Sequence, residues 1–159
     1  MADVKLKYGT AATITISLSN LANNAARQSV VVSNATDLYL DNLVVMKLKT
    51  GNTGSSATGF INIYVYGSAN EGTTYSDGAT GSDAAITLTS PPNVRTIGII
   101  NAVANNVTYV GGPYSVAAAF GGMLPKQWGV IVENKCGASL SITEGNHGKL
   151  RQGILIQSA

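Results

Sequence analysis

Apolar and polar residues alternate along short segments of this chain. In residues 13–18, Ile14, Ile16 and Leu18 are separated by small residues that carry hydroxyl groups. Residues 61–66 repeat the pattern, with isoleucine and valine at one set of positions and asparagine and tyrosine at the other. Because successive side chains of a β-strand point to opposite faces, each segment predicts a half-buried strand.

Segments of this kind recur throughout the sequence, giving about ten or eleven short predicted strands. The further ones are 30–32, 38–48, 85–88, 96–101, 107–110, 114–120, 128–133, 139–142 and 153–157. Clusters of glycine, asparagine, aspartate and proline lie between them, as expected for turns. The one helical candidate is Leu21–Arg27. We therefore expect an all-β fold with little helix, an antiparallel, jelly-roll-like β-sandwich that forms a single domain over residues 1–159.

The N-terminal residues suggest a first candidate interface. Val4, Leu6 and Tyr8 alternate with charged residues, among them Lys5 and Lys7. Lysines on an edge strand also discourage unwanted pairing, which is the simpler interpretation of these two. We expect residues 1–10 to form an arm or edge strand that pairs with a neighbouring chain.

Tyr64 and Tyr66 are a second candidate interface, because they share the polar face of one predicted strand. Tyrosine is favoured where proteins meet and where sugars stack, and it also packs across strands within a sheet. The sequence leaves these three roles open.

The composition argues against several classes of partner. Only 11% of the residues are charged, compared with about 25% in an average protein. A sparsely charged surface lowers the cost of desolvation when proteins associate. The net charge of +2 comes from scattered residues without a basic cluster, so we expect no nucleic-acid partner. The longest uncharged stretch, 96–125, is interrupted by Asn, Gly and Pro, and no signal peptide is evident, so we expect no membrane partner.

The residues that usually carry catalysis are scarce. His147 is the only histidine and lies in a turn-like segment, where we expect it to be exposed or locally hydrogen-bonded. Cys136 is the only cysteine, so it cannot form an intrachain disulfide. Asp77 and Asp83 do not have the spacing of a calcium-binding loop. We expect no catalytic residues, no cofactor and no metal, and hence no enzyme activity.

One segment resembles a known family. Residues 117–135, which run from the Ala-rich stretch before Phe120 through Trp128 to Lys135, are similar to a family of small virion structural proteins of tailed bacteriophages. Residues 13–16, 26–29, 65–68 and 152–153, together with the strand around Tyr39, match in character. Trp128 itself is expected to anchor the core.

The resemblance implies a non-enzymatic component present in many copies on the virion. A domain of this size is most like a capsid decoration, or cement, protein. Such a protein is made in the host bacterial cytoplasm and sits on the capsid surface. Its partners would be the major capsid protein and copies of itself, as a trimer or alternatively a dimer.

Three other functions remain open from the sequence. The chain could be a tail or head–tail connection component, which is also all-β and assembled. It could be a carbohydrate-binding module that uses Tyr64, Tyr66 and Trp128. An enzyme is the third alternative, although no substrate is suggested.

Overall fold

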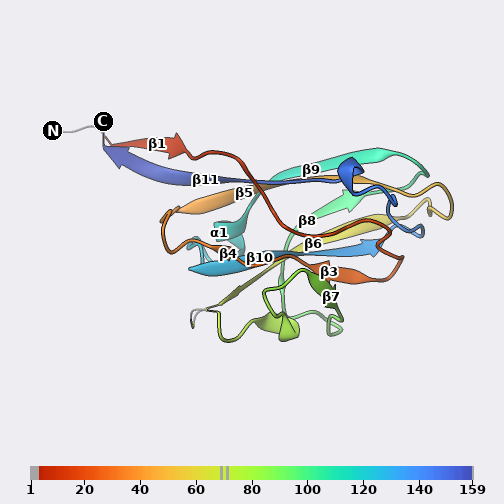
Figure 1. The fold of residues 1–159 in the computed structure, drawn as a ribbon, viewed down its shortest axis with the longest axis horizontal. Helices are drawn as coiled ribbons and strands as arrows, with labels where there is room; N and C mark the ends of the chain where they lie inside the picture. Colours follow the sequence, from red (N-terminus) through yellow and green to blue (C-terminus); the bar gives the residue numbers. More distant parts are fainter. Residues whose placement is uncertain (1–3, 69, 71, 159) are drawn as a thin grey trace.

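A computed structural model describes residues 4–68, 70 and 72–158 of the chain. The described residues form two antiparallel sheets that face each other (Figure 1). The first sheet contains β1 (Val4–Tyr8), β2 (Ala12–Thr13), β5 (Asp41–Lys49), β9 (Thr108–Ser115) and β11 (Gly148–Ser158). The second contains β3 (Ala26–Gln28), β4 (Val32–Ser33), β6 (Phe60–Ser68), β7 (Ala84–Ile86), β8 (Arg95–Asn101) and β10 (Gln127–Lys135).

The order of the strands is that of a jelly roll. β1 and β2 both pair with β11, so they act as one interrupted strand, and β3 and β4 act likewise beside β10. The first sheet then has the order β1/β2, β11, β5, β9, and the second has the order β3/β4, β10, β6, β8, with β7 added outside β3. Two four-stranded sheets connected in this way form the double Greek key of a jelly roll. The predicted fold class is confirmed.

The main core lies between the sheets and follows the predicted alternation. Ile61, Ile63 and Val65 of β6 are fully buried against it, as are Trp128 and Val130 of β10. Trp128 is therefore the core anchor that the sequence predicts. In β5 and β6 every second side chain is buried in the interior, which is the periodicity expected of a two-layer sandwich.

A second, smaller core lies on the outer face of the second sheet. The chain between β6 and β8 folds back across this face and carries η1 (Ser76–Gly78) and β7. Tyr64, Tyr66 and Ile131 project from the sheet and are buried beneath Ala79 and Val94. The loop segments on either side of β7 therefore cover the outer face of this one sheet, while β7 itself extends its edge beside β3 (Figure 1).

The helix prediction is wrong in position. Residues 21–25 form turns, and β3 follows directly. Asn134 explains this: its side-chain amide donates to the Leu21 carbonyl, and the Asn24 N–H donates to the Asn134 carbonyl. The short helix α1 (Val116–Ala119) instead lies in a segment predicted as strand, and Ser115 caps it by accepting from the Ala118 N–H. A second short helical turn is η2 (Glu144–Asn146).

Candidate interaction surface

A two-stranded ribbon leaves one end of the sandwich. β1 pairs with the last residues of β11, in a register that joins Val4 to Ser158 and Tyr8 to Ile154. The neighbouring strand β5 begins at Asp41, opposite Ile154, so β11 continues beyond its other partner. Figure 1 shows β1 and the end of β11 extending past the start of β5. Residues 4–8 of the predicted arm thus pair with the C-terminal strand of their own chain, and residues 1–3 lie outside the described residues. Pairing with a neighbouring chain stays a prediction.

The exposed apolar residues of this ribbon share one face, whereas the other face carries Lys5 and Lys7, with Gln157 and Leu155 opposite them. Val4, Leu6 and Tyr8 lie on one face, together with Ile156, which stands directly opposite Leu6. Their side chains are 70%, 71%, 60% and 53% exposed, respectively. Lys5 and Lys7 point to the other face, because adjacent residues of a strand alternate. An isolated strand pair that exposes large apolar side chains is typical of a protein interaction site.

The base of the ribbon is fixed by Tyr39. The Gly9 N–H donates to the Gly153 carbonyl at 2.8 Å, so these glycines stand opposite each other where the ribbon begins. A Cβ atom on Gly153 would lie 2.4 Å from the Tyr39 ring, which shows that the ring rests on this bare backbone. Asn34 holds Tyr39 from behind by accepting from its N–H and donating to its carbonyl. Tyr39 and Asn34 therefore attach the base of the ribbon to the sandwich.

Tyr64 and Tyr66 do not belong to this surface. Their side chains are 6% and 0% exposed, because the chain between β6 and β8 covers them. Tyr66 donates to the Ser29 carbonyl at 2.7 Å, and its ring meets the edge of the Tyr75 ring with centroids 5.1 Å apart. The prediction of an intermolecular interface is corrected here: these tyrosines form an interface within the chain. The sequence could not reveal this, since a covering segment has no local signal.

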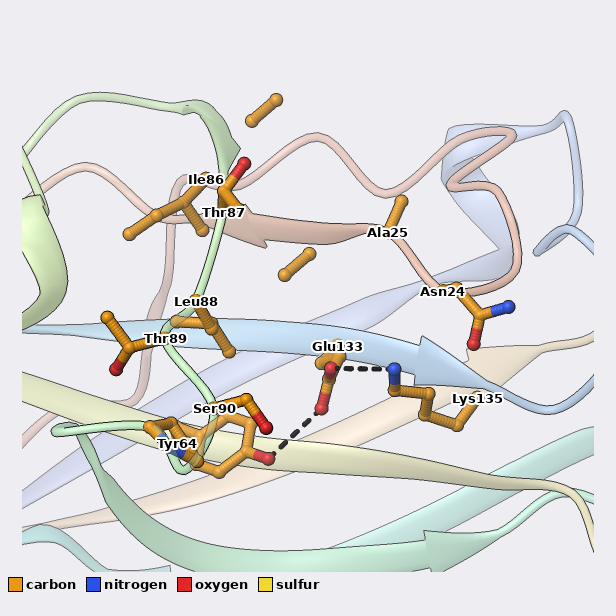
Figure 2. A pocket seen from close by; sticks show the side chains of 13 residues that line it. Asn24, Ala25, Tyr64, Ile86, Thr87, Leu88, Thr89, Ser90, Glu133 and Lys135 are labelled. Carbon is orange, nitrogen blue, oxygen red and sulfur yellow. Dashed lines mark hydrogen bonds and ion pairs between the residues drawn. The ribbon is translucent and has the colours of Figure 1, made fainter.

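Beside Tyr64 lies a cleft of about 630 Å³. Figure 2 shows the Tyr64 hydroxyl and the Lys135 ammonium group directed at Glu133, which projects from β10. Glu133 Oε2 accepts from Tyr64 at 3.0 Å and from Asn62 at 2.9 Å, and Oε1 lies 3.1 Å from Lys135 Nζ. Both oxygens of this carboxylate are thus already hydrogen-bonded inside the chain.

These contacts determine the protonation states in the cleft. Burial alone would raise the pKa of Glu133, but hydrogen bonds from Asn62, Lys135 and Tyr64 outweigh it and lower that pKa. Burial and the adjacent carboxylate raise the pKa of Tyr64 to about 12. At neutral pH the cleft therefore holds a carboxylate paired with an ammonium group and a neutral phenol. The carboxylate, the ammonium group and the phenol of this cleft thus contact one another.

The scarce catalytic residue types have structural roles. His147 is 5% exposed; its Nε2 donates to the Ser141 carbonyl and its Nδ1 accepts from the Lys49 N–H. The sequence predicted that His147 is either exposed or locally hydrogen-bonded. In the structure it is hydrogen-bonded and buried. Cys136 is fully buried, and burial raises the pKa of its thiol. Among the described residues, no three His, Cys, Asp or Glu side chains come together as a metal site.

Two aspartates of the chain between β6 and β8 hold it in place: Asp83 joins it to the rest of the sandwich, and Asp77 makes its hydrogen bonds within it. Asp83 accepts from Arg27 Nε at 2.6 Å and from the Ser17 N–H and hydroxyl. Asp77 accepts from Thr89 and Asn93.

In the part of the chain that the structure describes, no helix is both long and apolar enough to cross a membrane.

Comparison with known proteins adds no relative: no protein-family model matches this chain, and no curated protein matches it. The ribbon is thus identified by its own geometry. Sequence reasoning found Val4, Leu6 and Tyr8 but missed their partner Ile156 and the supporting Tyr39. The alternation of Ile154 and Ile156 in the last predicted strand was the signal that could have found the other half of the ribbon.

Proposed function

We propose that this chain is a non-enzymatic structural protein of a bacteriophage virion, and specifically a capsid decoration (cement) protein. It binds the shell formed by the major capsid protein, on the capsid surface, and stabilises it. The resemblance of residues 117–135 to small virion proteins is the sequence argument for this assignment.

The exposed ribbon is the observation that carries the proposal. Its apolar face and unpaired edges are a liability for a protein that stays alone, because such edges template aggregation. They are an advantage for a protein whose partner covers them permanently. Val4, Leu6, Tyr8 and Ile156 would then be buried against the shell, as the apolar centre of a protein interface usually is.

The rest of the molecule suits a clamp between neighbouring subunits. A jelly roll with a fully packed core is rigid, and the jelly roll occurs in viral capsid domains as well as in lectins. Fold alone does not assign function, so it only agrees with the proposal. Self-association as a trimer, with a dimer as the alternative, would present several ribbons at once and raise the avidity for a repeating shell.

The competing functions have less support in the side chains. A sugar-stacking platform needs exposed aromatic rings, whereas Tyr66 and Trp128 are fully buried. A general base needs a free imidazole or carboxylate, whereas His147 and Glu133 are hydrogen-bonded within the chain.

Purified particles of the phage that encodes this chain provide the test. Quantitative mass spectrometry should find it in a fixed ratio to the major capsid protein, and electron microscopy with a labelled chain should place it on the head. Finding it only on isolated tails would assign it to the tail or the head–tail connection instead. Its absence from particles would overturn the proposal altogether.

A further inference from the structure

We propose that the partner of the ribbon is an extended strand that alternates apolar and acidic residues and adds to the free edge of β1. This inference rests on the proposed function, because it gives the chemistry of the surface that the ribbon would contact. It follows from three observations on the ribbon: the phase of its backbone hydrogen bonds, its two chemically distinct faces, and two unpaired lysines.

The hydrogen-bond phase identifies the groups that a new strand would meet. Gly9 donates to Gly153, so this opposed pair is a hydrogen-bonded pair of the antiparallel ladder. Hydrogen-bonded and non-hydrogen-bonded pairs alternate, so Lys7 and Lys5 direct their backbone groups toward β11. The backbone N–H and C=O groups of Val4, Leu6 and Tyr8 therefore point outward, along an edge that no described strand occupies.

The side chains define what that strand must carry. A residue directly opposite Leu6 on an added strand lies on the apolar face, beside Val4, Tyr8 and Ile156. A residue opposite Lys5 or Lys7 lies on the other face. Among the described residues, neither lysine side chain has a hydrogen bond or an ion pair, and each is exposed. Carboxylates opposite these lysines would complete the ribbon, with apolar residues at the positions between them.

The same lysines argue against a second copy of the chain as the occupant. Two β1 strands could pair antiparallel across a two-fold axis centred on Lys5, Leu6 or Lys7. Within the five residues of β1, each of these registers sets apolar residues opposite apolar residues and a lysine directly opposite a lysine. Like charges in that position are destabilising. The pattern thus selects against self-pairing at this edge and in favour of an acidic partner strand.

Three synthetic peptides test the inference with the full chain. In them valine alternates with glutamate, with glutamine or with lysine. Chemical-shift titration should show the glutamate peptide binding about tenfold more tightly than the lysine peptide, since two opposite-charge pairs replace two like-charge pairs. The amide groups of Val4, Leu6 and Tyr8 should gain protection from hydrogen exchange when the glutamate peptide binds.

A charge-reversed variant supplies the matched comparison. The double change Lys5→Glu and Lys7→Glu should reverse the preference toward the lysine peptide. The control is the double change Lys47→Glu and Lys49→Glu, which lies on β5 and changes the net charge of the chain by the same amount. It should leave the preference for the glutamate peptide unchanged. Equal binding of the three peptides, no binding of any, the same loss in both variants, or β1–β1 dimers in sedimentation would each overturn the inference.

The two proposals fail separately. If the chain decorates heads but the Lys5/Lys7 variant decorates them equally well, the partner chemistry is wrong and the function stands. If the peptides bind as expected and the chain is absent from heads, the proposed function is wrong and the chemistry of the edge stands.

Discussion

Individual charged side chains replace strand partners in the segment after β2. Buried and exposed side chains alternate along residues 14–18 as predicted, yet these residues do not form a regular strand. Lys149 Nζ donates to the Ile16 carbonyl at 3.0 Å, and Glu144 Oε2 accepts from the N–H groups of Leu18 and Ser19. Lys149 and Glu144 also contact each other directly. This ion pair therefore satisfies backbone groups that a ladder would otherwise satisfy.

The change Glu144→Gln should lower the free energy of unfolding by about 2 kcal/mol, because it leaves the buried Lys149 ammonium group without its counter-charge. Urea unfolding at neutral pH measures this loss. Lys135→Met is the control and should cost less than about 1 kcal/mol, because the Lys135 side chain is 34% exposed and Glu133 keeps its hydrogen bonds from Asn62 and Tyr64. Equal effects of the two changes would contradict the special role of Glu144.

His147 should make stability depend on pH in a narrow window. Because the Ser141 carbonyl can only accept, the imidazole proton sits on Nε2, and Nδ1 must stay unprotonated to accept from Lys49. Burial lowers the pKa of His147 below its usual 6.5, while the unfolded chain keeps the usual value. The unfolded state therefore binds more protons as the pH falls through about 6.5, and stability decreases toward acid.

Unfolding free energies at pH 7.5 and pH 5.5 should show this decrease, since both values lie above the carboxylate range. His147 is the only histidine, so His147→Gln should abolish the difference between the two pH values. A variant that keeps the same pH dependence would assign the effect to another group.

At the scale of elements, Tyr75 joins the segment that covers the second sheet to the sheet itself. Tyr75 meets Tyr66 edge-on and donates to Gln127 Oε1 at 2.8 Å. Gly129 stands opposite Tyr66 in the sheet, and a Cβ atom there would lie 2.2 Å from the Tyr66 ring. The Tyr66 ring therefore covers the bare backbone of Gly129. Aromatic side chains protect glycines of a sheet in this way.

The change Tyr75→Ala should loosen this covering segment without unfolding the sandwich. Limited proteolysis should then cut within residues 72–92 much faster than in the parent chain, because the local opening energy falls while the main core keeps its packing. The control Ile63→Ala removes a side chain from the main core and should cost about 2–5 kcal/mol in global unfolding. If Tyr75→Ala lowers the global stability as much as Ile63→Ala, the covering segment and the main core unfold together.

In contrast to this covering segment, the ribbon contributes little to the free energy of unfolding. All five residues of β1 are exposed, so Leu6→Ser should change the free energy of unfolding by less than about 0.5 kcal/mol. The same change should strongly reduce binding of the protein to phage heads, because it removes the centre of the apolar face. Thermal unfolding and co-sedimentation with particles measure the two effects. A variant that binds heads normally would separate the ribbon from the proposed function.

For the whole molecule, the distribution of charge explains how so few charged residues suffice. Asp77, Asp83, Glu133 and Glu144 all have lowered pKa values because hydrogen bonds outweigh the effect of burial. Each of them fastens one segment to another, so the charges hold the loops in place. Lys5 and Lys7 differ, since they face outward on the ribbon without a partner among the described residues. On the ribbon, two unpaired charges therefore lie on the strand whose apolar side chains are also exposed.

The sequence by itself determined the two-residue alternation of apolar and polar side chains, and hence the class of the fold. The alternation at Ile61 to Val65 fixed which side chains face the core, and the alternation of Val4, Leu6 and Tyr8 marked the ribbon. These features are local, because strand geometry alone assigns neighbouring residues to opposite faces. Tertiary structure decided the rest: it buried Tyr64 and Tyr66 beneath a distant segment, replaced the helix predicted at Leu21–Arg27 with turns and the start of β3 through Asn134, and paired β1 with β11 of the same chain. Each of these depends on contacts between residues far apart in sequence, and no local pattern records them.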